Sequence, residues 1–283
     1  MLLQGERIGS TALALLGALA AAIAMLGCEI SRDEEVQLGS DFAAEINAQL
    51  PLVDDPAVTG YVQALGERIA GTADERALAW HFHVVNSDAV NAFAIPGGHV
   101  YVNRGLIERV HAMPQLAGVL GHEIGHVTMR HSVEQMQTAQ KTNIGVAVVC
   151  LITQMCDNEV ARVAIDVGGA AFFARHSRAD EEEADSVAIG YLLRAGIDPH
   201  GIPGFFQVML EEREREPGIV EGWFGTHPME EERIDRTRQL LNAIDPATIS
   251  SLDRGDGRLQ AARQRLSRLP PAPPPPEDQA APF

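Results

Sequence analysis

Two histidines and a glutamate lie close together near the middle of the chain, in the stretch LGHEIGHVTMRH (residues 120–131). His122 and His126 are four residues apart, and Glu123 follows the first of them. On a helix this spacing places the two imidazoles about 40° apart on one face, so that both can reach one metal ion. Glu123 is offset by about 100°, which suits a general base better than a ligand. The pattern predicts a catalytic zinc site, although a chance match on a helix would look the same.

A catalytic zinc ion needs a third protein ligand. The metzincin extension of the motif would require glycine and histidine where this chain has Met129 and Ser132. His131 is nine residues beyond His122, about 180° around a continuous helix. We therefore expect His131 to support the site from outside or to lie on the surface, and not to bind the same ion.

An acidic segment at residues 176–185 offers the missing carboxylate. Glu181 and Asp185 are four residues apart and share a helix face. One of them could bind the metal while the other orients a histidine. The alternative is a helix whose acidic first turn is favoured by the helix dipole.

The elements that must position these residues can be read from the hydrophobic pattern. Helices are predicted at residues 41–50, 56–70, 115–134, 179–195, 204–214 and 229–243, with an apolar helical hairpin at 143–173. Strands are predicted at residues 80–86, 92–95 and 99–103, the last two joined by a Pro-Gly-Gly turn. We expect an α+β, mainly α, fold in which a three-stranded antiparallel sheet packs on helices. Residues 31–36 are expected to be a charged spacer, and residues 269–283 a disordered tail.

The composition is that of a globular protein, with 46% hydrophobic and 22% charged residues in a chain of 283. A formal net charge of −17 repels nucleic acid, which is therefore not an expected partner. No internal repeat indicates an attached repeat-type binding module.

The first 27 residues are apolar and rich in alanine and leucine, as in an export signal. They end in Met25-Leu26-Gly27-Cys28, which resembles the bacterial lipobox, where the cysteine is lipidated. Glu29 follows, whereas aspartate at that position would argue against the outer membrane. A lipoprotein is the favoured reading, and an uncleaved membrane anchor or a cleaved soluble form are the alternatives.

The predicted domain organisation has a signal peptide at residues 1–27, a metallopeptidase domain at 28–245 and a C-terminal extension at 246–283. Two cysteines, Cys150 and Cys156, remain if Cys28 is lipidated. Their spacing is compatible with a disulfide and equally with two buried thiols.

Four motifs, in a fixed order between residues 36 and 243, resemble one family of zinc metallopeptidases. The family includes the CAAX prenyl proteases, HtpX and the mitochondrial Oma-type proteases. The matching segments are NAFAIPGGHVYVN (91–103), HEIGH (122–126), SRADEEEAD (177–185) and THPMEEERI (226–234). The match is nearer to the periplasmic lipoprotein members of LoiP and BepA type than to members with several transmembrane helices. BepA-like proteins add a tetratricopeptide array, whereas only a short segment follows residue 245 here.

The resemblance implies a gluzincin-type domain that binds one Zn²⁺ per chain. The implied ligands are His122, His126 and Glu181, with Glu123 as the catalytic base. Asp185 would orient the site from outside, and Glu182 and Glu183 would be bystanders. His227 would donate to the oxyanion or cap the ion, and otherwise it caps a helix before Pro228. Arg233 would pair with a carboxylate of the site, or else lie on a solvated helix face.

The segment that precedes the motif is expected to be an edge strand to which an extended protein substrate adds through backbone hydrogen bonds. Its residues are Asn91, Ala92, Phe93, Ala94, Pro96, Gly97 and Gly98. The alternative is a hairpin that only closes the core. The remaining histidines show no ligand spacing and are expected to be structural or exposed: His81, His83, His99, His111, His176 and His200.

The expected function is a zinc endopeptidase that degrades misfolded or unassembled envelope proteins. It would be lipid-anchored on the periplasmic side, in the outer membrane, and its oligomeric state is left open. Two alternatives remain: an assembly or quality-control factor whose proteolysis is secondary or latched by His227, and a structural lipoprotein with a degenerate site. The intact HExxH motif, together with Glu181 and Asp185, argues against the last.

Overall fold

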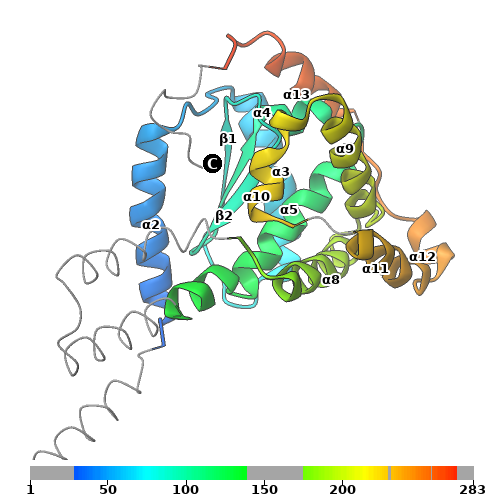
Figure 1. The fold of residues 1–283 in the computed structure, drawn as a ribbon, viewed down its shortest axis with the longest axis horizontal. Coiled ribbons are helices and arrows are strands. Elements are labelled where there is room, and N and C mark those ends of the chain that lie inside the picture. Colours follow the sequence, from blue (N-terminus) through cyan, green and yellow to red (C-terminus); the bar gives the residue numbers. More distant parts are fainter. Residues whose placement is uncertain (1–28, 139–174, 229–230, 256, 273–283) are drawn as a thin grey trace, which may run out of the picture.

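The computed structural model describes residues 29–138, 175–228, 231–255 and 257–272 (Figure 1). The predicted signal, Cys28, the apolar segment 143–173 with both other cysteines, and residues 273–283 lie outside these ranges. Within the described ranges, no helix has the length and apolar character needed to cross a membrane.

The described chain is mainly helical, with one small sheet near its start. Before and within the sheet come α2 (Arg32–Gln49), α3 (Pro56–Ala73), β1 (His81–Val85), β2 (Ala92–Ile95) and β3 (His99–Asn103). The motif region follows as α4 (Arg104–Arg109), α5 (Met113–Thr128) and α8 (Arg178–Arg194). The C-terminal part comprises α9 (Gly201–Arg215), the short 3₁₀ helix η2 (Pro217–Ile219), α10 (Glu221–Thr226), α11 (Glu231–Asn242), α12 (Pro246–Ser250) and α13 (Arg258–Leu266).

The first described helix begins nine residues earlier than predicted. α2 starts at Arg32, where a charged spacer was expected at residues 31–36. Ser31 caps it: its hydroxyl accepts from the backbone N–H of Glu34, whose carboxylate accepts from the backbone N–H of Ser31. The capping pattern therefore outweighs the polar composition that suggested a spacer.

The sheet is mixed, so the prediction of an antiparallel sheet is wrong for one of its two pairings. The strand order is β1-β3-β2, with β1 parallel and β2 antiparallel to β3. Only β2 and β3 are joined by a tight turn, in which Gly97 and Gly98 have positive φ angles of 84° and 99°. The alternation of residues in the first strand predicts which side chains share a face, but it does not predict the direction of the strand. The connection between β1 and β2 is longer than a tight turn, so β3 can lie between these two strands and pair with both.

The two faces of the sheet pack against different helices. Phe82, Val84 and Val102 belong to the main core, which α3 and α5 share. On the other face, α2 contributes Ala43 to a smaller cluster with Tyr101, Val85 and Ile95. Figure 1 shows α2 along one side of the sheet and α3 and α5 on the other. The motif helix α5 is thus enclosed between the sheet, α3, α8 and α9.

A glycine inside the motif sets how closely α8 approaches α5. A Cβ atom at Gly125 would lie 3.1 Å from Val187 Cγ2 and 3.2 Å from the carbonyl oxygen of Ala184. Contacts this short are tighter than a Cβ atom normally makes, so any residue larger than glycine here would require α8 to shift by a few tenths of an ångström. The close approach brings the acidic face of α8 to the two histidines of α5.

The described part of the C-terminal extension packs on the core. Leu259, Ala262 and Leu266 of α13 are buried in the main cluster, against α3 and α4. Asp253 forms an ion pair with Arg68 at 2.6 Å. The carbonyl oxygen of Pro270 accepts from Arg104 at 2.9 Å, so the chain is attached beyond residue 269, where the disordered tail was expected to begin. Whether residue 245 is a domain boundary stays a prediction.

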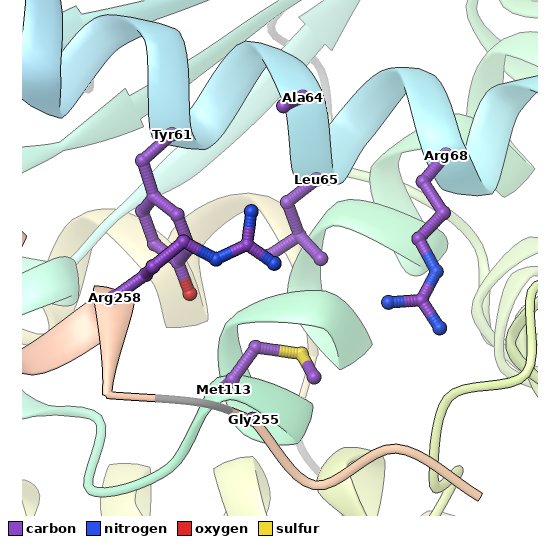
Figure 2. Close-up of a pocket in the computed structure, with 7 residues that line it drawn as sticks. All are labelled: Tyr61, Ala64, Leu65, Arg68, Met113, Gly255 and Arg258. Atoms are coloured by element: carbon purple, nitrogen blue, oxygen red, sulfur yellow. The ribbon is translucent and has the colours of Figure 1, made fainter.

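A small cavity of about 90 Å³ lies between α3 and the segment that leads into α13 (Figure 2). Tyr61, Leu65 and Arg68 line it from α3, and Met113 and Arg258 from the facing segments. It is lined by no residue of the predicted site.

Candidate metal centre

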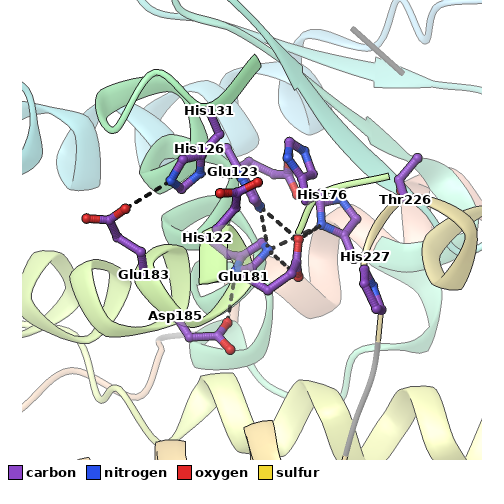
Figure 3. Close-up of polar contacts among 12 residues, drawn as sticks. His122, Glu123, His126, His131, His176, Glu181, Glu183, Asp185, Thr226 and His227 are labelled. Carbon is purple, nitrogen blue, oxygen red and sulfur yellow. Dashed lines mark hydrogen bonds and ion pairs between the residues drawn. The ribbon is translucent and has the colours of Figure 1, made fainter. Parts of the chain in front are cut away.

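Four buried side chains from three parts of the chain converge on one point (Figure 3). His122 and His126 come from α5, Glu181 from the first turn of α8, and His227 from the residue that ends α10. One ligand atom of each lies within 4.8 Å of all the others. Two imidazoles and a carboxylate in a buried cluster are the donor set of catalytic zinc sites. The residues present therefore fit a metal ion of this kind.

The three predicted ligands are brought together by these contacts. His126 Nε2 lies 3.0 Å from His122 Nε2 and 3.3 Å from Glu181 Oε1. His227 Nδ1 lies 3.0 Å from Glu181 Oε1 and 3.4 Å from His122 Nε2. The side chain of His227 is therefore a fourth member of the cluster, while its backbone N–H caps α10 by donating to Trp223.

Nδ1 of His122, the ring nitrogen that faces away from the cluster, contacts the buried ion pair of Asp185 and Arg233. His122 Nδ1 lies 2.9 Å from Asp185 Oδ1. Arg233 donates to both oxygens of Asp185 at 2.9 Å, and its Nη1 lies 2.5 Å from Glu181 Oε2. Arg233 is itself buried, so it belongs to the site and does not lie on a solvated helix face.

Nδ1 of His126, the ring nitrogen that does not face Glu181, contacts another histidine, His131. His126 Nδ1 lies 2.9 Å from His131 Nδ1, and His131 Nε2 lies 3.2 Å from Glu183 Oε2. The predicted helix 115–134 is wrong at this point, because α5 ends at Thr128 and Arg130 has a positive φ of 65°. The resulting turn redirects the chain, so His131 is buried beside His126 instead of lying on the opposite side of a continuous helix.

Two residues that were not expected near the site lie against it. The ring of His176 stacks on that of His126 with centroids 3.8 Å apart, and its backbone N–H donates to the carbonyl oxygen of Thr226. Glu183, expected to be a bystander, contacts His131. The only sequence signal for His176 was its place one residue before the Ser-Arg of the acidic motif.

Glu123 is buried beside the cluster, with one oxygen unused. Its Oε1 has no hydrogen-bond partner in the described part of the chain and lies 3.5 Å from His227 Nε2. The backbone N–H of Ala94, on β2, donates to the carboxylate. Burial raises the pKa of Glu123, against the lowering effect of His227 and His122. A buried carboxylate with a raised pKa and a free oxygen is suited to accept and return a proton.

Burial and neighbouring charges shift the pKa values of the residues at the cluster in different directions. Burial would lower the pKa of His122, but Glu181 and Asp185 outweigh it and raise that pKa to about 10. Burial and the neighbouring His176 hold the pKa of His126 well below its usual value. Burial would raise the pKa of Asp185, yet Arg233 and His122 lower it. Burial would likewise raise the pKa of Glu181, but His227 and His122 hold it well below its usual value, so Asp185 and Glu181 are ionised, as a metal ligand and its support must be.

The predicted substrate segment lies beside this cluster. β2 is an edge strand of the sheet, and Ala94 reaches the Glu123 carboxylate from it. Residues 96–98 form the turn to β3. Asn91 is buried just before the strand, and its backbone carbonyl accepts from Asn103.

Comparison with known proteins shows which protein family has this sequence pattern. Peptidase family M48 matches residues 56–241, about two thirds of the chain, and this segment contains every residue of the cluster. The chain belongs to this family. Similar proteins include the beta-barrel assembly-enhancing proteases of Yersinia pestis and Escherichia coli (strain K12), 32% and 31% identical over 80% of this chain. These alignments cover 48% and 47% of the relatives, so the chain spans about half their length.

Two relatives of other names match as well. Metalloprotease YcaL of Escherichia coli (strain K12) is 29% identical over 63% of this chain and 66% of its own length. Mitochondrial metalloendopeptidase OMA1 of Schizosaccharomyces pombe is 26% identical over 75% of this chain and 63% of its own. The names describe metal-dependent proteases, in agreement with the donor set.

Proposed function

We propose that this protein is a zinc-dependent endopeptidase. The observation that supports it best is the convergence of His122, His126 and Glu181 beside Glu123, whose Oε1 has no partner among the described residues. Membership of peptidase family M48 supports the same reaction class. The proposal assigns the first three residues as metal ligands and Glu123 as the general base.

The roles of the residues follow from where they lie. Zinc at such a site supplies Lewis acidity, which polarises a peptide carbonyl and makes water more acidic. Glu123 accepts the proton of the attacking water and returns it to the leaving amine, for which its raised pKa is suited. Asp185 and Arg233 hold His122 in place. An extended substrate adds to the free edge of β2, close to the carboxylate of Glu123.

The test of the base is casein degradation by the purified protein and by Glu123→Gln. The variant keeps the size of the side chain but cannot accept a proton, so the rate should fall about 10²–10⁴-fold. Glu134→Gln is the matched control, since Glu134 is an exposed residue shortly after the motif. Equal degradation by Glu123→Gln and the unmodified protein would show that the base is assigned wrongly.

The test of the ligand set is metal content after mild purification. We expect about one equivalent of zinc per chain, and a large loss in Glu181→Ala because a catalytic site needs all three protein ligands. Glu182→Ala, one residue along, removes the same charge from a partly exposed side chain that pairs with Arg236. Zinc below half an equivalent in the unmodified protein, unchanged by Glu181→Ala, would contradict the assignment.

We also propose where the protein works and on what. The relatives named beta-barrel assembly-enhancing protease support a role in the bacterial envelope, on misfolded or unassembled periplasmic and outer-membrane proteins. The Leu-Gly-Cys sequence supports a lipid anchor at Cys28. Metabolic palmitate labelling should disappear in Cys28→Ala and persist in Cys150→Ala. Label that survives Cys28→Ala would remove the anchor from the proposal.

A second candidate is an assembly or quality-control factor in which His227 holds the site closed. Its support is the place of His227 in the cluster, 3.0 Å from Glu181 Oε1. As a latch, His227 occupies a position that water needs, so His227→Ala should degrade casein faster. As an oxyanion donor, the same substitution should slow degradation about 10²–10³-fold. The sign of the change separates the two roles.

A further inference from the structure

The two histidines of the motif are supported in different ways. His122 contacts a carboxylate directly, whereas His126 contacts the imidazole of His131, which in turn contacts Glu183. His131 is only 2% exposed. A buried imidazole between a metal ligand and a carboxylate has to carry its proton on one particular nitrogen.

The hydrogen-bond partners determine that nitrogen. If His126 presents Nε2 to the metal, its proton is on Nδ1 and is donated to Nδ1 of His131. His131 then carries its own proton on Nε2 and donates it to Oε2 of Glu183. Every ring nitrogen in this series of contacts then has a defined donor or acceptor role.

We propose that His131 and Glu183 are positioning residues of the metal centre: they hold His126 in the tautomer and orientation that bind zinc. The proposal rests on the zinc site proposed above. It assigns a role to a histidine that spacing along the motif excludes as a ligand, and to a glutamate two residues after the third ligand in sequence.

The turn that brings His131 into place is itself held by buried charge. Arg130 adopts a positive φ of 65°, which is uncommon for a residue with a side chain. Its guanidinium donates to Glu35 at 2.9 Å, and Glu35, at 0% exposure, also accepts from Arg76. Arg76 donates in addition to the carbonyl oxygen of Val127, in the last turn of α5. An unusual backbone conformation maintained by such a network indicates that the position of the next residue, His131, matters.

The exposure of the two carboxylates predicts how strongly each supports its histidine. Asp185 is buried and paired with Arg233, whereas the side chain of Glu183 is 51% exposed. Solvent screens the charge of Glu183. The imidazole of His131, buried against His126, should therefore matter more for zinc affinity than the charge of Glu183 beyond it.

The experiment measures zinc affinity by competition with a chromogenic chelator, using the full chain. His131→Phe keeps the ring but removes the acceptor, and should weaken zinc binding about 10–100-fold. His131→Gln restores an acceptor oxygen and should recover part of this loss. Glu183→Ala should weaken binding by less than His131→Phe, and Glu182→Ala, which changes the same charge one residue away, should leave it unchanged. The visible spectrum of the Co²⁺-substituted protein should shift in His131→Phe and stay unchanged in Glu182→Ala.

Far-ultraviolet circular dichroism of the metal-free forms shows whether each variant is folded. If His131→Phe does not fold, the comparison of Glu183→Ala with Glu182→Ala decides. Folded His131→Phe that binds zinc as tightly as the unmodified protein, or equal losses in Glu183→Ala and Glu182→Ala, would overturn the inference. An unmodified protein that binds no zinc would instead defeat the proposed function, so the two failures are distinguishable.

Discussion

Histidines gather at two places in this protein, and only one of the two groups has the surroundings of a metal site. The site group consists of His122, His126, His131, His176 and His227. The sheet group consists of His81, His83 and His99, whose rings stack on the face of the sheet. Both groups contain three or more imidazoles within a few ångströms, so proximity alone does not separate them.

The difference lies in the acceptors around the rings. In the site group, Asp185, Glu181 and Glu183 contact ring nitrogens and fix the direction of each imidazole. In the sheet group, Nε2 of His83 and Nδ1 of His99 are buried with no hydrogen-bond partner among the described residues. The imidazoles of a metal site must point their nitrogens at one place, and carboxylates behind the rings achieve this. Stacked rings without them serve the packing of the sheet.

The largest effect is expected from removing the charge that neutralises the site's carboxylates. Arg233→Met leaves Asp185 and Glu181 buried without their cation, which should lower the free energy of unfolding by about 3–5 kcal/mol. Urea unfolding of the metal-free protein measures this loss. Arg236→Met is the control: Arg236 is 57% exposed and pairs with Glu182, so its removal should cost less than about 0.5 kcal/mol. Equal losses would mean that the buried network does not hold the site group.

The second prediction concerns the carboxylate behind His122. Asp185→Asn keeps an oxygen that can accept from His122 Nδ1 but loses the charge, so zinc affinity should fall about 10–100-fold. Chelator competition measures the change, with the exposed Asp235→Asn as the control. Unaltered affinity in Asp185→Asn would show that charge behind the ring is not what distinguishes the site group.

A smaller effect is expected in acid, and it comes from the sheet group. Burial lowers the pKa of His83 and of His99 from 6.5 to about 4 in the folded protein. Between pH 6.5 and 4 the unfolded chain therefore binds protons that the folded chain excludes, and stability falls as the pH falls. In the double variant His83→Phe, His99→Phe, the urea midpoint should fall less steeply over this range. Parallel pH profiles for the variant and the unmodified protein would contradict this reading.

The last prediction is that replacing histidines of the sheet group leaves zinc content and activity unchanged. The same double variant should keep its zinc equivalent and its rate of casein degradation, because neither ring belongs to the metal cluster. His122→Phe should lose both. A loss of zinc from the double variant would break the distinction between the two groups of histidines.

Local signals in the sequence predicted the parts of the fold that local interactions determine. The bounds of β2 and β3 match the prediction because a Pro-Gly-Gly turn separates two short runs, and only glycine adopts the positive φ angles there without strain. The spacing of four residues likewise predicts that His122 and His126 share one face of a helix, whatever the rest of the fold. The family resemblance selected Glu181 among neighbouring acidic residues, which spacing alone left open.

What the sequence missed depends on contacts between distant segments. The sequence left open whether His131 supports the site or lies on the surface; it reaches His126 because α5 ends at Thr128 and Arg130 is held by Glu35, which is 95 residues away in sequence. His176 reaches the site through the approach of α8 and α10. The direction of β1 depends on which strand pairs beside it, and alternation of polar and apolar residues carries no information about that.

Gly125 occupies one of the two positions in HEIGH that a general HExxH pattern leaves free. In this chain that position is restricted, because a Cβ atom there would press on Val187 and on the backbone of Ala184. Ala184 lies one helical turn after Glu181, so the separation of the two helix axes decides how far the Glu181 carboxylate extends between the imidazoles. The distances among the side chains of the cluster consequently depend on the backbone spacing of the two helices as well as on which side chains form it.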